Sequence, residues 1–134
     1  MEHDGDWARM VQERLDQRPE GARVSLRHVP ARSAGTIGSR KRGFEDQYFD
    51  DYVAAIRAVE GQFDLIVIDG RAREACLAAA VSRLAPGGRI LVDDFKRARY
   101  RAAARASGLA TECKDGLAVC LPLPDSTALL SRAC

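Results

Sequence analysis

Apolar residues recur at the spacing of one helix face in several stretches of the chain. Near the N-terminus they are Trp7, Met10, Val11 and Leu15. This spacing predicts a helix from about Asp6 to Gln17, which Pro-Glu-Gly then ends. The same pattern predicts a helix in FDDYVAAIRAVEG, residues 49–61, and a third helix near Arg97 to Ser107.

Two other stretches are continuous apolar runs. FDLIVID, residues 63–69, and RILVDDF, residues 89–95, flank the alanine-rich segment AREACLAAAVSRLAPGG, residues 72–88. Apolar runs without alternation are typical of parallel strands that are covered on both faces. We therefore expect a β-α-β unit with a right-handed crossover, whose helix is ended by Pro-Gly-Gly.

The remaining segments continue an alternation of strands and helices. RVSLRHV, residues 23–29, is predicted as a strand, and PARSAGTIGSRKRG, residues 30–43, as a loop. A strand is expected near Leu109 to Glu112, followed by a pair of short strands in GLAVCLPLPDSTALLSR, residues 116–132. With no internal repeat and no linker, the pattern predicts one α/β domain over residues 1–134.

Composition narrows the class of protein. The chain has 134 residues, of which 46% are hydrophobic, and 21 Lys+Arg against 19 Asp+Glu leave a net charge of +2. This balance does not indicate a polyanionic partner. No run approaches the roughly 20 apolar residues of a membrane helix, and the acidic start MEHDGD is unlike a signal peptide. We expect a cytoplasmic protein without a membrane partner.

Cysteine and histidine spacing does not indicate a zinc site. The residues concerned are Cys76, Cys113, Cys120, Cys134, His3 and His28. They form no C-x-x-C pair and no other spacing typical of zinc ligands. We interpret the cysteines as reduced thiols that pack as small apolar groups.

A basic loop is the chief candidate for nucleic-acid binding. It contains Arg32, Arg40, Lys41 and Arg42, with no aromatic residue before Phe44. Such a run is typical of a solvated loop, so the sequence does not favour nucleic acid as a partner.

Acidic residues stand where strands are predicted to end. Asp69 ends one apolar run, and Asp93 and Asp94 end the other. Glu2 and Asp4, in MEHD, resemble the tail of a further strand. Because ligands of open parallel sheets bind at the carboxyl ends of the strands, these acids are candidates for a site. The alternative is that they cap helices or simply face solvent.

Four segments carry a resemblance to a known family. They are EHDGDW, FDLIVIDGRAR, LAPGGRILVDDF and DGLAVCLPLPDSTALL. Together they resemble the later part of a class I S-adenosylmethionine-dependent methyltransferase, and IDGRAR followed by PGG is similar to small-molecule and sugar O-methyltransferases. The resemblance implies a three-layer α/β/α Rossmann-like fold, with a mostly parallel sheet and an antiparallel C-terminal hairpin.

The resemblance begins after the first strand of that fold and its glycine-rich turn. It therefore implies an N-terminally truncated domain that binds S-adenosylmethionine weakly or not at all when alone. It also implies cofactor-binding residues. Glu2, with Asp4 beside it, matches the acid that accepts hydrogen bonds from the cofactor ribose, and Asp69 matches the acid beside the methyl donor and the substrate. Asp69 is accordingly the expected catalytic residue.

Metal and substrate residues are implied in the same way. Asp69 and Asp93 match the strand ends that hold a divalent ion in some relatives, and magnesium prefers such oxygen ligands. Arg71 and Arg73 are candidates to bind a carboxylate or phosphate of the acceptor, with Asp94 as a further substrate contact. The alternative for the two arginines is an exposed helix start, and for Asp93 and Asp94 a helix cap.

Two functions follow as expectations. The first is S-adenosylmethionine-dependent O-methyl transfer to a small molecule or sugar; the second is a non-catalytic methyltransferase-like module that acts through protein–protein interaction. Without the first strand, FDLIVID has an open edge. Either RVSLRHV pairs with this edge, or a second polypeptide does, as a homo-oligomer or a complementing chain.

Overall fold

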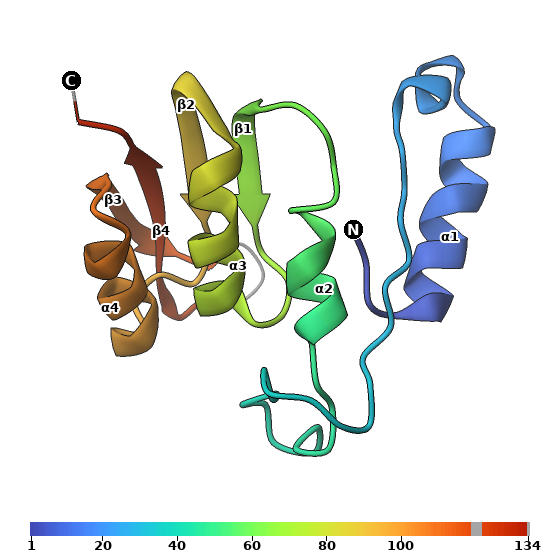
Figure 1. Cartoon of the computed structure of the whole chain (residues 1–134), viewed down its shortest axis with the longest axis horizontal. Helices are drawn as coiled ribbons and strands as arrows, with labels where there is room; N and C mark the ends of the chain where they lie inside the picture. Colours follow the sequence, from blue (N-terminus) through green and yellow to red (C-terminus); the bar gives the residue numbers. More distant parts are fainter. Residues whose placement is uncertain (119–121, 134) are drawn as a thin grey trace. The chain divides into compact units, whose positions relative to one another are not determined.

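The chain folds into two compact units, Met1–Ala55 and Ile56–Cys134. The computed structural model describes residues 1–118 and 122–133. Its helices and its four-stranded mixed sheet make the protein an α/β protein, as the alternating pattern predicted (Figure 1).

Helix α1 (Gly5–Asp16) opens the first unit and lies within one residue of its predicted bounds. The Asp4 side chain caps it by accepting a hydrogen bond from the Trp7 amide at 3.0 Å. A short 3-10 helix, η1 (Pro19–Arg23), follows. Local features of the sequence therefore explain where this helix forms, because a capping residue precedes it and apolar residues recur along one face of it.

Helix α2 (Asp50–Ala55) is shorter than the helix predicted over residues 49–61. Beyond Ala55 the hydrogen bonding tightens to a turn in which the Val59 amide donates to the Ile56 carbonyl. Phe49, only 1% exposed, anchors the start of the helix. Its ring makes edge contacts with His3 at 5.5 Å and with Tyr52 at 6.1 Å. Phe49 is buried in the first unit together with Ala8, Val53 and Ala55.

The predicted strand RVSLRHV is wrong, except at one residue. His28 forms an isolated parallel bridge with Glu2, through the bonds Glu2 N to Arg27 O at 2.9 Å and Val29 N to Glu2 O at 2.7 Å. A strand needs a neighbour along its whole length to satisfy its backbone groups, and the segment MEHD offers only one such residue. Glu2 itself lies in this isolated bridge and not in a strand of the described residues.

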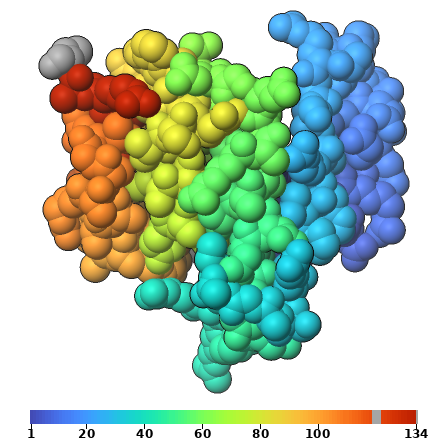
Figure 2. Space-filling view, in the orientation of Figure 1, coloured from blue at the N-terminus to red at the C-terminus, as the bar shows by residue number. Residues whose placement is uncertain are grey.

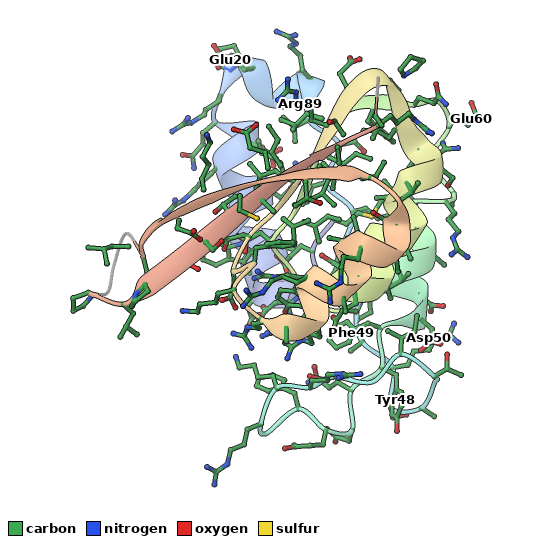
Figure 3. All side chains as sticks on the ribbon, turned by 90° about the vertical axis from the view of Figure 1, so that its left-hand side faces the viewer. Glu20, Tyr48, Phe49, Asp50, Glu60 and Arg89 are labelled. Carbon is green, nitrogen blue, oxygen red and sulfur yellow. The ribbon has the colours of Figure 1, made fainter. Side chains whose placement is uncertain are left out.

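The loop predicted over residues 30–43 is held by a carboxylate. Asp50 accepts hydrogen bonds from the Thr36 amide and hydroxyl and from the Ile37 amide. Isolated bridges from Tyr48 to Arg32 and Gly38 close the loop. Figure 3 shows Tyr48, Phe49 and Asp50 where the loop meets α2. The first part of the loop, from Arg32 to Gly38, is thus held against Tyr48 and Asp50.

The second unit is built on one sheet. Its elements are β1 (Phe63–Ile68), α3 (Arg73–Ala80), η2 (Val81–Arg83), β2 (Leu84–Val92), α4 (Ala98–Ser107), β3 (Ala110–Leu117) and β4 (Pro124–Ser131). The strand order is β1-β2-β4-β3, with β1 and β2 parallel and β4 antiparallel to both of its neighbours. Helices α3 and α4 pack side by side on one face of the sheet (Figures 1 and 2).

Three details differ from the prediction for this unit. The helix ends at Ala80 and β2 begins at Leu84, so Pro-Gly-Gly lies within the strand rather than at the end of the helix. The strand predicted near Leu109 to Glu112 extends to Leu117 and forms the antiparallel hairpin with β4. The described residues after Leu109 therefore contain two strands instead of three; residues 119–121, with Cys120, and Cys134 lie outside the described part.

The core of the second unit lies between the sheet and the two helices. Its fully buried side chains include Leu77, Leu84, Ile90, Val92 and Leu130. The opposite sheet face carries Leu65 and Val67, which are 57% and 58% exposed. Among the described residues β2 is the strand neighbour of β1 in the sheet, and the pairing of its other edge, by RVSLRHV or by a second polypeptide, stays a prediction.

Gly88 is the glycine of Pro-Gly-Gly that the packing requires. A Cβ at this position would lie 2.8 Å from the Phe63 carbonyl oxygen and 2.9 Å from Leu84 Cδ1. We expect Gly88→Ala to lower the free energy of unfolding by about 1–3 kcal/mol, because β1 and β2 must separate at their irregular register. Urea denaturation measures the loss. Gly116→Ala, with open space around it, is the control, and equal midpoints for the two variants would refute the prediction.

Candidate functional site

Acidic residues follow the two parallel strands at one edge of the sheet. Asp69 comes directly after β1, and Asp93 and Asp94 come directly after β2. The Asp93 amide donates to the Ile68 carbonyl at 3.2 Å, which ties the two strand ends together. The structure therefore brings Asp69 and Asp93 to one place, as parallel strand ends require.

Arg73 is in the first turn of α3, and its side chain lies between these strand ends. Its Nη2 donates to the Asp69 carboxylate at 2.9 Å and to the Asp69 carbonyl at 2.8 Å. Its Nη1 donates to the Asp93 carbonyl and lies 3.9 Å from the Asp93 carboxylate. Its Nε donates to the Gly70 carbonyl at 3.1 Å. The Arg73 side chain is only 13% exposed, and these hydrogen bonds hold its guanidinium between the two strand ends.

The acids after β2 have partners from other elements. Thr127 of β4 donates its hydroxyl to Asp93 at 3.2 Å. Asp94 pairs with Arg97 just before α4, and its side chain is only 18% exposed. The antiparallel strand β4 thus contributes to a site that is otherwise made by β1 and β2.

Tyr100 supports the site from α4. The residue is 7% exposed, and its ring lies 4.7 Å from the guanidinium carbon of Arg99, 5.6 Å from that of Arg73 and 6.0 Å from that of Arg97. Arg99 also donates to the Tyr100 hydroxyl at 3.1 Å and pairs with Glu74 of α3 at 2.9 Å. Cations over an aromatic face are attracted to it, so Tyr100 helps to fix the arginines.

Two residues at the site have left-handed backbones. Ala72 has a φ of 48° and Asp94 a φ of 53°. Such conformations are unfavourable for residues other than glycine and are concentrated at functional sites. The acids at the strand ends do not cap the helices that follow. The N-cap residue of α3 is Ala72 and that of α4 is Arg97, and neither helix has a side-chain cap. Capping therefore does not explain the acids at these strand ends.

The environment of Asp69 changes its acidity. Loss of water around the carboxyl raises its pKa, the Arg73 guanidinium lowers it, and the neighbouring Asp93 carboxyl raises it further through charge and a hydrogen bond. The net effect is a raised pKa, although the side chain is 64% exposed. A carboxylate with a raised pKa accepts a proton more readily, as a general base must.

We expect Asp93→Asn to lower the pKa of Asp69. The change removes a like charge, and the new amide can donate a hydrogen bond to ionised Asp69. A ¹³C NMR titration of the Asp69 carboxyl carbon measures the shift. Asp125→Asn, on β4, is the matched control that leaves this titration unchanged. An Asp69 pKa that stays the same or rises in Asp93→Asn would contradict the electrostatic interpretation.

The strand ends do not fit a divalent ion in this arrangement. The Arg73 guanidinium donates to the Asp69 carboxylate and to the Asp93 carbonyl and lies 3.9 Å from the Asp93 carboxylate, so a cation between these oxygens would meet its positive charge. Nor do the residues within 1–118 and 122–133 contain any group of three or more His, Cys, Asp or Glu side chains arranged to hold a metal ion.

Glu2 and Asp4 belong to the first unit. Glu2 Oε1 accepts from the His3 and Asp4 amides at 2.6 and 2.9 Å, while Oε2 has no hydrogen-bond donor among the described residues. Asp4 lines a hollow of about 500 Å³, together with His3, Arg32 and Gln47. Oε1 also lies 2.8 Å from His3 Nδ1, so one carboxylate oxygen holds the Glu2 side chain, which is 23% exposed.

Sequence reasoning missed several contributors to the site. Thr127 and Tyr100 reach it only through strand and helix packing, and nothing in their local sequence indicates this. The i, i+3 spacing of Asp94 and Arg97 was a signal that could have been used. Arg71, the neighbouring substrate candidate, is partly exposed in the turn after β1.

The part of the chain that the structure describes has no helix long and apolar enough to cross a membrane.

Comparison with known proteins does not assign the chain to a family. No model of a known protein family matches the chain, and no curated protein is significantly similar to it.

Proposed function

We propose that this chain is a class I S-adenosylmethionine-dependent methyltransferase that methylates an oxygen of a small molecule or sugar. The strand order carries the proposal. In that fold the last strand of the chain is antiparallel and lies in the sheet between the two strands that precede it in the sequence. β4 lies in the same way between β2 and β3. The four strands here would then be the fourth to the last of a Rossmann-like sheet.

The strand-end acids support the same proposal. Methyl transfer needs an acceptor oxygen held in line with the methyl group and relieved of its proton. Asp69, exposed at the end of β1 and with a raised pKa, has the properties of the base. Arg73 and Tyr100 position it, and Arg71 is the remaining candidate to bind an anionic group of the acceptor.

The cofactor proposal rests on the first unit. S-adenosylmethionine supplies an electrophilic methyl group on sulfur. Glu2 has one carboxylate oxygen without a donor among the described residues, which suits a ribose hydroxyl. Asp4, in the adjoining hollow, is the second proposed contact, although its carboxylate also caps α1.

An NMR titration tests the proposal at millimolar ligand, where weak binding is visible. We expect S-adenosylmethionine to shift the amide signals of Glu2 to Gly5 and of Asp69 to Arg71, and S-adenosylhomocysteine to compete with it. Methionine and ATP serve as controls. Transfer of isotope-labelled methyl to a panel of hydroxylated small molecules then tests catalysis. No saturable shift in either segment would reject methyl transfer by this chain on its own and favour the non-catalytic candidate.

The exposed sheet face favours a second candidate, a non-catalytic module that binds another protein. Leu65 and Val67 present apolar surface on β1, which is the edge strand of the sheet that the described residues form. Such an edge is a template for an added strand. Oligomeric state by light scattering, measured together with the cofactor titration, separates this candidate from the catalytic one.

A further inference from the structure

We propose that the Arg73 guanidinium takes the place of a divalent cation between the two strand ends, so that the site works without a metal ion. The inference rests on the geometry of the second unit and holds whether or not the chain transfers methyl groups.

The acceptors around Arg73 are those of a cation site. Carboxylate and backbone carbonyl oxygens of Asp69 and Asp93 surround it, together with the Gly70 carbonyl. Hard divalent cations bind this combination of oxygens. A guanidinium satisfies the same oxygens through its planar set of five donors, and it keeps its charge at any ordinary pH.

The position of Arg73 is built into the fold and is not a surface ion pair. The side chain is 13% exposed and lies 5.6 Å from the Tyr100 ring. Its Nη1 reaches across from α3 to Asp93, on the neighbouring strand end. Arg99, which also lies on Tyr100, pairs instead with Glu74 and contacts neither strand end. Arg73 is therefore the positioning residue of the strand ends, and Arg99 is its natural control.

Removing the guanidinium should open the site to metal. In Arg73→Ala the two carboxylates and the carbonyl oxygens lose their positive partner. We expect this variant to bind one Mn²⁺ per chain at least roughly ten-fold more tightly than the wild type. Electron paramagnetic resonance of Mn²⁺ measures binding, and Mg²⁺ competition checks that oxygen ligands are used. Arg99→Ala should gain no binding, and Arg73→Ala with Asp93→Asn should lose the gained site.

A second measurement tests the proposal if the Arg73→Ala variant folds poorly. If Arg73→Ala is unfolded without metal, Mg²⁺ is titrated and the native amide spectrum followed. Recovery of that spectrum supports the proposal, and failure to recover at millimolar Mg²⁺ overturns it. Arg73→Lys, which keeps the charge, should fold and remain without a metal site. Saturable Mn²⁺ binding by the wild type at Asp69 and Asp93, or a folded Arg73→Ala that binds no Mn²⁺, would also overturn it.

Discussion

Replacing Asp69 by asparagine is expected to lower the rate of methyl transfer about 10²- to 10⁴-fold, the usual loss when a general base is removed. Asparagine keeps an oxygen that can accept the Arg73 hydrogen bond but cannot take a proton from the acceptor. Radiolabelled methyl transfer to the best acceptor of the wild type measures the effect. Binding of S-adenosylmethionine should remain, since Glu2 and Asp4 are unchanged.

The variant should also fold. Because the native pKa of Asp69 is raised, its ionised form disfavours the native state as pH rises from the unfolded-state pKa through the native one. Asparagine removes this dependence. Asp64→Asn, an exposed acid on the same strand, is the matched control and should keep full activity. An Asp69→Asn protein with wild-type rates would exclude Asp69 as the base.

Leu130→Ala is expected to give the largest loss of stability, about 2–5 kcal/mol. Leu130 is fully buried and pairs with Ile90 in the register of β4 and β2. Its removal leaves a cavity in the layer between the sheet and the helices. Because the chain forms two units, unfolding in urea should be followed by the amide signals of β2, which report on the second unit.

Leu117→Ala is the control for this prediction. Leu117 lies at the end of β3 and is 71% exposed, so its truncation should change stability by no more than about 0.5 kcal/mol. Similar losses in the two variants would mean that β4 does not form the centre of this core.

The candidate site and the core depend on the same strand, β4. Its residues facing the helices, Ala128 and Leu130, are buried in the core, whereas Thr127 on the other side donates to Asp93. A modest shift of β4 would therefore disturb the strand-end acids as well as the packing. We expect core variants in β4 to affect ligand binding even where the protein remains folded.

Local pattern determined much of the secondary structure. Helix α1 lies within one residue of its predicted bounds, and β1 begins and ends nearly where the apolar run does. The end of α4 at Ser107, followed by Gly108, was also predicted from the sequence. These features depend on neighbours within a few positions, namely apolar spacing, a capping side chain and a glycine, so the sequence is sufficient to predict them.

The sequence also placed Asp69 and Asp93 at neighbouring strand ends, because parallel strands bring their carboxyl ends to one edge. What each side chain does there was decided by tertiary structure. Arg73 lies between the two strand ends and donates to both, a contact that its position in the sequence did not indicate. Thr127 joins the site from a strand that the sequence separates from Asp93 by more than 30 residues.

Segments that depend on a partner were the ones the sequence could not settle. RVSLRHV has the composition of a strand, but only His28 forms a bridge. Pro-Gly-Gly is typical of the end of a helix, but it lies within β2. The sequence alone determined the helical and apolar segments and the acids that follow the strands. The tertiary structure decided which segments became strands and which charges met, because backbone hydrogen bonds and ion pairs need a partner that is distant in the chain.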